Sequence, residues 1–145
     1  MWLLIISILI DQITKIFASN LTKTIEIFPK ILSFEYVENR GAVFGIMQGS
    51  NTILIIVSCL ICIGLIYYLY KQKKENKKVS IAWYMILSGG IGNLIDRIFR
   101  GYVVDFIATP FIATFNIADS FVVVGVLWLL ILELKDYIKT LRKSS

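Results

Sequence analysis

Carboxylates are the side chains of this 145-residue chain with the clearest potential for chemistry, because histidine is absent. Imidazole metal ligands and nucleophiles paired with histidine are therefore excluded. Two carboxyl groups held close together cannot both ionise easily, so one of them keeps a proton. Such a pair can hydrolyse an amide, with the ionised partner activating water and the protonated partner assisting the carbonyl. A proton relay in a transporter could use the same groups, and residue types alone do not separate these two functions.

Three aspartates differ in how well their local sequence explains them. Asp105 has apolar neighbours on both sides and no local partner. Asp119 follows Asn116 by three residues, a spacing typical of a helix N-cap with an acidic residue in the first turn. Asp11 and Lys15 are four residues apart, so they could neutralise each other on one helix face. Asp105 is therefore the strongest candidate for a chemical role, whereas the other two aspartates have a structural alternative.

One polar segment combines glycine with charged and amide side chains. Asp96 adjoins Arg97 and so points to a different helix face, which favours pairing of Asp96 with another element or with Arg100. Asn93 lies three residues before Asp96, on the same helix face. Glycine occupies three of the four positions 89–92, although each glycine costs about 1 kcal/mol of helix stability against alanine in water. The glycines indicate close packing of membrane helices or, alternatively, an opening for the backbone of a substrate.

The composition of the chain predicts that a membrane is its solvent. Hydrophobic residues make up 57% and charged residues 17%, and the mean hydropathy is +0.77. A spanning helix needs roughly 20 apolar residues, and runs of about this length occur at 1–19, 50–70, 79–98 and 117–137. We therefore predict an all-α polytopic membrane protein with four transmembrane helices in a single membrane domain, residues 1–145.

The distribution of basic residues predicts the orientation of these helices. Segments 71–78 and 138–145 contain eight basic residues in 16 positions, whereas loops 20–49 and 99–116 contain four in 48. The positive-inside rule places both termini and segment 71–78 in the cytoplasm, and the two longer loops outside. The net charge of +5 is then a topology signal beside anionic lipid, and nucleic-acid binding is not expected.

The first outer loop is predicted to contain a small extracytoplasmic β-sheet. Residues 24–27 and 32–37 alternate polar with apolar or aromatic side chains, and Pro29 lies between them at a turn. Asn39 and Gly41 fall at the end of the second strand. The polar side chains named above then map to one layer near the outer membrane interface. This convergence, which follows from the topology, is the main evidence for a functional site.

Four motifs occur along the chain in this order: DQITK at 11–15, ENRGAVFG at 38–45, GGIGNLIDR at 89–97 with VVDF at 103–106, and FNIADS at 115–120. Together they resemble the motifs of the lipoprotein signal peptidases, the type II signal peptidases of bacteria, over essentially the whole chain. The resemblance implies Asp105 and Asp119 as the catalytic pair. It implies supporting or substrate-binding roles for further residues: Asp11, Lys15, Asn39, Gly41, Asn93, Asp96, Arg97 and Asn116.

The resemblance also implies an activity and a location. The activity is that of a membrane aspartyl endopeptidase that removes the signal peptide from diacylglyceryl-modified prolipoproteins, cutting before the lipidated cysteine. The enzyme would be a multi-pass protein of the bacterial cytoplasmic (inner) membrane with its active site at the outer face. Expected partners are prolipoprotein signal peptides, membrane lipid and globomycin-like inhibitors. No metal or organic cofactor is expected, and a monomer suffices for the chemistry.

Two other functions are compatible with the residues alone. A small proton-coupled transporter would depend most on Asp11 or Asp96, and it should show broken helices in paired halves of the chain. A non-catalytic membrane scaffold would need no cluster of carboxylates at all. The protease differs from both, because it requires Asp105 and Asp119 together.

Overall fold

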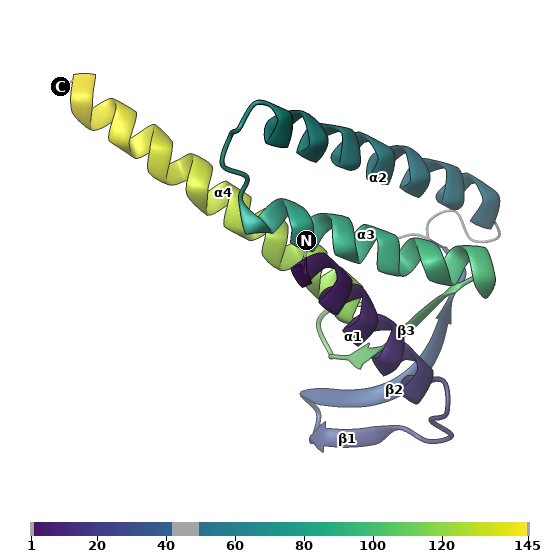
Figure 1. Ribbon diagram of the computed structural model, residues 1–145. Helices are drawn as coiled ribbons and strands as arrows, with labels where there is room; N and C mark the ends of the chain where they lie inside the picture. Colours follow the sequence, from purple (N-terminus) through teal and green to yellow (C-terminus); the bar gives the residue numbers. More distant parts are fainter. Residues whose placement is uncertain (1, 42–49, 145) are drawn as a thin grey trace.

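Four helices and three strands make up the described part of the chain, residues 2–41 and 50–144 of a computed structural model (Figure 1). Motif residues 42–45 lie outside it. The elements are, in chain order, α1 (Trp2–Ala18), β1 (Ile25–Phe28), β2 (Leu32–Asn39), α2 (Asn51–Lys74), α3 (Ile81–Phe99), β3 (Val103–Ala108) and α4 (Ile117–Ser144).

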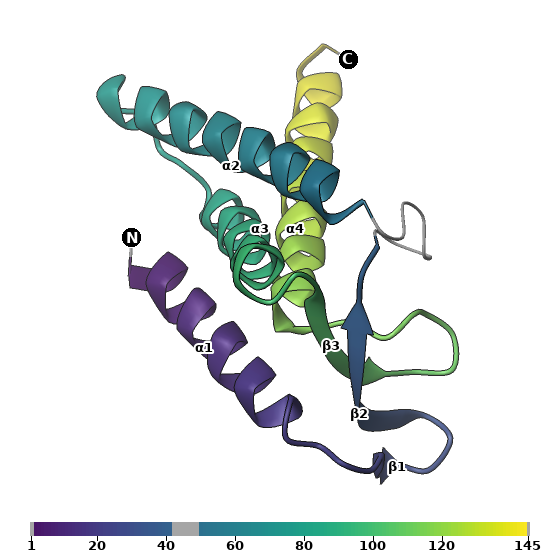
Figure 2. The same ribbon diagram turned by 90° about the vertical axis from the view of Figure 1, so that its right-hand side faces the viewer.

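Helix α3 is the centre of the bundle and packs against α1, α2 and α4 (Figures 1 and 2). The sheet lies at one end of the bundle, where α1 and α3 end and α4 begins. Helices α2 and α4 continue past the apolar runs 50–70 and 117–137 into basic sequence. This extension is expected physically, because lysine, arginine, glutamine and leucine are good helix formers in water as well.

The predicted small β-sheet is confirmed, with one strand more than the sequence indicated. Its strands are antiparallel in the order β1-β2-β3. Strand β3 runs inside loop 99–116, where Val103, Val104, Asp105 and Phe106 are all buried, so that no alternation marks the strand. Because Asp105 pairs with Val37 of β2, the third strand brings this aspartate against loop 20–49.

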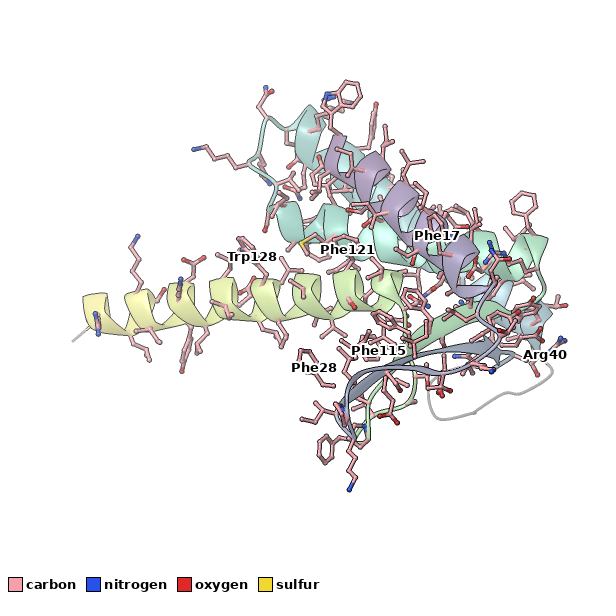
Figure 3. All side chains as sticks on the ribbon, turned by 90° about the horizontal axis from the view of Figure 1, so that it is seen from below. Phe17, Phe28, Arg40, Phe115, Phe121 and Trp128 are labelled. Carbon is pink, nitrogen blue, oxygen red and sulfur yellow. The ribbon has the colours of Figure 1, made fainter. Side chains whose placement is uncertain are left out.

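The apolar side chains form a small core and a large exposed surface. One core cluster, at the sheet end, contains Ala18, Val104 and Phe106, while a second joins α2 and α3. Large apolar side chains project from the outer faces of the helices, among them Phe17 and Trp128 (Figure 3). Helices α2 and α4 are also long and apolar enough to cross a membrane. Lipid is the solvent that matches such a surface.

Glycines of α3 permit close contact with α1 and α4. A Cβ atom added at Gly89 would collide with the carbonyl oxygen of Ala118 in α4. One added at Gly92 would lie 2.6 Å from Oδ2 of Asp11 in α1 and 3.2 Å from the Cβ of Ala118. Both glycines are buried. The interpretation of close helix packing is therefore confirmed at these two positions, and the alternative of an opening for substrate is wrong there.

Candidate active site

Asp105, a residue of β3, lies between two amide side chains from other parts of the chain. Its side chain is 2% exposed. Asn39, from the neighbouring strand, donates Nδ2–H to Oδ2 of Asp105 at 2.8 Å, and Asn116 donates Nδ2–H to Oδ1 at 2.7 Å. The partners that local sequence could not supply thus come from residues 66 and 11 positions away.

Asp119 belongs to a reciprocal cap at the start of α4. The side-chain oxygen of Asn116 accepts the N–H of Asp119 at 2.9 Å, and Oδ2 of Asp119 accepts the N–H of Asn116 at 3.2 Å. This is the capping-box arrangement, so the predicted N-cap is confirmed. Asp119 has a further contact, since Asn93 of α3 donates Nδ2–H to its Oδ1 at 2.7 Å. The carboxylate of Asp119 therefore accepts hydrogen bonds from α3 and from the start of α4, and the residue remains partly exposed.

Asn116 connects the two aspartates. It caps α4 beside Asp119 and at the same time donates to Asp105. Its Nδ2 group also donates to Oδ1 of Asn93 at 3.1 Å. The side chain of Asn116 is fully buried, so these bonds are made away from bulk water. The geometry therefore places both carboxyl groups around one shared amide.

The surroundings of Asp105 favour its protonated form. Burial raises the pKa of this carboxyl to about 6, and the negative charge of Asp119 acts in the same direction. The hydrogen bonds from Asn39 and Asn116 oppose the effect, because they stabilise the carboxylate. Asp105 can thus keep its proton under mildly acidic conditions in which an ordinary aspartate is ionised.

A buried ammonium group lies behind the two aspartates. Nζ of Lys15 is 3.0 Å from Oδ2 of Asp11 and 3.0 Å from Oδ2 of Asp96, and it donates to Oδ1 of Asn93 at 2.9 Å. Lys15, Asp11 and Asp96 are all buried. The expected Asp11–Lys15 pair is confirmed, and so is the expected pairing of Asp96 with Arg100, at 3.4 Å.

Gly41 and Arg97 complete the set of site residues predicted from the sequence. The N–H of Gly41 donates to Oδ1 of Asn39 at 3.0 Å, which leaves the amide group of Asn39 directed at Asp105. The guanidinium of Arg97 is half-buried within the electrostatic reach of Asp119, Asp105 and Asp96. Within the described residues, its side chain makes no hydrogen bond. The structure therefore brings all ten predicted residues to the same end of the bundle.

Gln12 was not among the predicted site residues, although it lies in the first motif. Its Nε2 group donates to Oδ2 of Asp11 at 3.1 Å, to the carbonyl oxygen of Gly92 at 3.1 Å and to Oδ1 of Asp96 at 3.3 Å. Helical spacing places Gln12 about 100° from Asp11 on α1, which argues against a common partner. Its place in the first motif, between two charged site residues, was the available signal.

The arrangement suits proton transfer at an amide. It contains one buried carboxyl group whose pKa is raised to about 6 and one partly exposed carboxyl group at a helix N-terminus, where a negative charge is favoured. Such a pair can exchange protons with a water molecule and a carbonyl group. In residues 2–41 and 50–144, no group of three or more acidic or cysteine side chains could hold a metal ion.

Comparison with known proteins identifies the family. Residues 3–135 match the family model described as signal peptidase (SPase) II. A protein of Clostridium novyi named lipoprotein signal peptidase is 44% identical over 92% of this chain and 96% of its own. A protein of the same name from Caldicellulosiruptor bescii is 41% identical over 93% and 91%.

Solved structures agree with these relatives. A bacterial membrane enzyme determined at 2.3 Å superposes with a TM-score of 0.83 and 33% identity, covering 92% of this chain and 86% of the other. A second, determined at 1.9 Å, gives a TM-score of 0.76 and 32% identity, covering 92% and 90%. The likeness thus extends over 92% of the chain in both cases. The chain belongs to the signal peptidase II family.

Proposed function

We propose that this protein is a membrane aspartyl endopeptidase that removes the signal peptide from diacylglyceryl-modified prolipoproteins, cutting before the lipidated cysteine. As a member of the signal peptidase II family, the chain is a protease of the membrane that processes prolipoproteins. One observation supports an aspartyl mechanism above all. The buried side chain of Asn116 hydrogen-bonds to both Asp105 and Asp119. The relatives are named for the same substrate class.

The geometry favours different roles for the two aspartates. Asp105 acts in its protonated form, which burial favours by raising its pKa to about 6, and hydrogen-bonds the carbonyl oxygen of the scissile bond. Asp119 is the base, because it lies in the first turn of α4, where the helix dipole favours a negative charge, and accepts the N–H of Asn116. It takes a proton from water while the water oxygen bonds to the carbonyl carbon, and the carbonyl oxygen takes the proton of Asp105.

The tetrahedral intermediate then collapses. Asp119 passes its proton to the amine nitrogen, the carbon–nitrogen bond breaks, and the hydroxyl proton returns to Asp105 as the carbonyl re-forms. The products are a new carboxyl terminus on the signal peptide and a free amino group on the lipidated cysteine. The pair is thereby restored to its starting protonation state. No metal or organic cofactor takes part in these steps.

Four transmembrane helices hold this site at the outer face of the bacterial cytoplasmic (inner) membrane. The spans are about 1–19, 50–70, 79–98 and 117–137 in a single membrane domain over residues 1–145, with both termini cytoplasmic. Two facts support them. Helix α1 turns Asp11 and Lys15 inward and apolar residues outward. Helix α4, with 28 residues, is about 42 Å long against roughly 30 Å of hydrocarbon, so its basic end reaches water.

The substrate and the inhibitor bind where lipid and the catalytic pair meet. The diacylglyceryl chains stay in the bilayer beside the exposed apolar faces of the helices, which keeps the scissile bond at the depth of Asp105 and Asp119. Binding energy from the lipid then raises specificity without a large protein pocket. Globomycin-like cyclic peptides block the same place. One copy of the chain supplies both aspartates and their partners, so a monomer is sufficient.

Cleavage of a defined prolipoprotein is the direct test. The detergent-purified protein is expected to release the signal peptide from a diacylglyceryl prolipoprotein, with the cut located before the lipidated cysteine by mass spectrometry. The same precursor with an unmodified cysteine is the matched control and should be cut at least about tenfold more slowly, because the lipid contributes binding energy. No cleavage by a well-folded protein would favour the transporter or scaffold.

The topology predicts a clear labelling pattern. In a protein with both native cysteines replaced by alanine, a membrane-impermeant maleimide should label Lys23→Cys in intact cells from outside. It should label Lys78→Cys only after lysis, because segment 71–78 faces the cytoplasm. Both lysines are exposed in the structure, so accessibility within the protein does not differ. Equal labelling of the two positions in intact cells would contradict the proposed orientation.

A further inference from the structure

The residue immediately before each catalytic aspartate is held by a carboxylate from another element. The N–H of Ala118, before Asp119, donates to Oδ1 of Asp11 at 2.8 Å. The N–H of Val104, before Asp105, donates to Oδ2 of Asp96 at 3.0 Å. Ala118 and Val104 have no exposed surface. The same kind of anchor therefore occurs at two places that are distant in sequence.

Both amides would lack a partner without these carboxylates. Ala118 is in the first turn of α4, whose N–H groups have no acceptor within the helix. Val104 lies in β3, which is an edge strand of the sheet. A buried N–H group without an acceptor is costly. Asp11 and Asp96 remove this cost and at the same time fix the backbone next to each catalytic residue.

Lys15 connects the two anchors. An ammonium group has three donors, and Nζ of Lys15 is within 3.0 Å of three oxygens, those of Asp11, Asp96 and Asn93. Asn93 in turn donates to Asp119. Without a cation between them, the two buried carboxylates would repel each other. Each of the three side chains that Lys15 contacts therefore contacts one of the catalytic aspartates or the residue before it.

We propose that Lys15 is a positioning residue that sets the relative placement of Asp105 and Asp119, by holding Asp96 against the amide of Val104 and Asp11 against the amide of Ala118. The inference rests on the proposed function, because it takes the two aspartates as the catalytic pair. Lys15 touches no reacting atom. It acts through two carboxylates and one amide, so its loss changes the turnover rate rather than the binding of substrate.

Amide hydrogen exchange measured by NMR in detergent tests the two anchors separately. Asp11→Asn should speed exchange at Ala118 about tenfold, because a neutral acceptor is weaker than a carboxylate, and should leave Val104 unchanged. Asp96→Asn should do the reverse. Lys15→Met should speed both. The control is Leu87→Ala, which removes a buried side chain of the other core cluster and should lower the melting temperature without a selective effect on either amide.

Kinetics on the same variants give the second readout. The two asparagine variants should lose about tenfold in kcat and Lys15→Met at least about 100-fold, each with KM nearly unchanged, while Leu87→Ala keeps the parent kcat per folded molecule. Equal acceleration of both amides by each of the two asparagine variants, or a parent kcat in all three variants, would overturn the proposal. If Lys15→Met does not fold, the two asparagine variants still decide. If the parent does not cleave, the proposed function fails, but the exchange pattern still tests the anchors.

Discussion

Asp105→Asn and Asp119→Asn are each expected to lower the rate of prolipoprotein cleavage by at least about 10³-fold, while the protein still folds. An amide can neither take a proton from water nor give one to the carbonyl oxygen, so both halves of the proton exchange are required. The measurement is single-turnover cleavage of the diacylglyceryl substrate by purified variants. Asp136→Asn is a matched control, because this aspartate is exposed near the far end of α4; it should retain the parent rate.

Asp105→Asn is expected to fold because its two effects on stability oppose each other. The pKa of Asp105 is about 6 in the folded protein, against an ordinary value of 3.8, so ionisation of the buried carboxyl costs about 3 kcal/mol at neutral pH. Asparagine removes that cost. However, Asn39 and Asn116 donate to opposite oxygens, so one donor loses its acceptor, at about 1–3 kcal/mol. The two effects nearly cancel at neutral pH.

The sign of the pH dependence follows from the same values. Because the folded pKa of Asp105 is the higher one, stability from this group is complete below about pH 4 and is lost as the pH rises to about 6. Asp105→Asn lacks this dependence. Its melting temperature should therefore be close to that of the parent at pH 7 and below it at pH 4.5. Cleavage that survives in either folded dyad variant would instead move the catalytic role to Asp96 or Asp11.

The sequence predicted those parts of the fold that depend on local pattern. Each apolar run corresponds to one helix, alternation revealed β1 and β2, and the spacing of Asn116 and Asp119 predicted the cap that the structure contains. Strand β3 was missed because its first four residues are all buried, which hides the period of two. A strand of this kind is recognised only through its neighbours.

The site was predicted as a set of residues but not as a network. Topology alone could place the polar side chains at one end of the bundle. It could not show that Lys15 reaches Asn93, 78 positions away, or that Asn39 reaches Asp105, 66 positions away. Such contacts depend on how closely α1, α3 and the sheet approach each other. That distance is set by small residues in α3, whose effect depends on the partner that packs against them.

Gly92→Ala is therefore expected to be among the most damaging single changes outside the proposed catalytic pair. The added Cβ would lie 2.6 Å from Oδ2 of Asp11, which cannot move freely because Lys15 and Gln12 bind the same oxygen. Either the carboxylate leaves Lys15 or α1 moves away from α3. Overpacking of this kind costs about 1–3 kcal/mol, and a displaced Asp11 should lower kcat at least about tenfold. Thermal unfolding in detergent and the cleavage assay measure both effects.

A glycine in a different environment provides the control for this argument. Gly64 of α2 has no atom within 4 Å of the position that a Cβ would take, so Gly64→Ala should leave activity unchanged and raise helix stability by up to about 1 kcal/mol. Gly89→Ala gives a second comparison, since its Cβ would collide with the backbone of Ala118 and separate α3 from α4 without touching Asp11. If Gly92→Ala behaves like Gly64→Ala, close contact between α1 and α3 does not hold the site together. If Gly89→Ala loses stability and Gly92→Ala loses more activity for the same loss of stability, the position of Asp11 itself matters for catalysis.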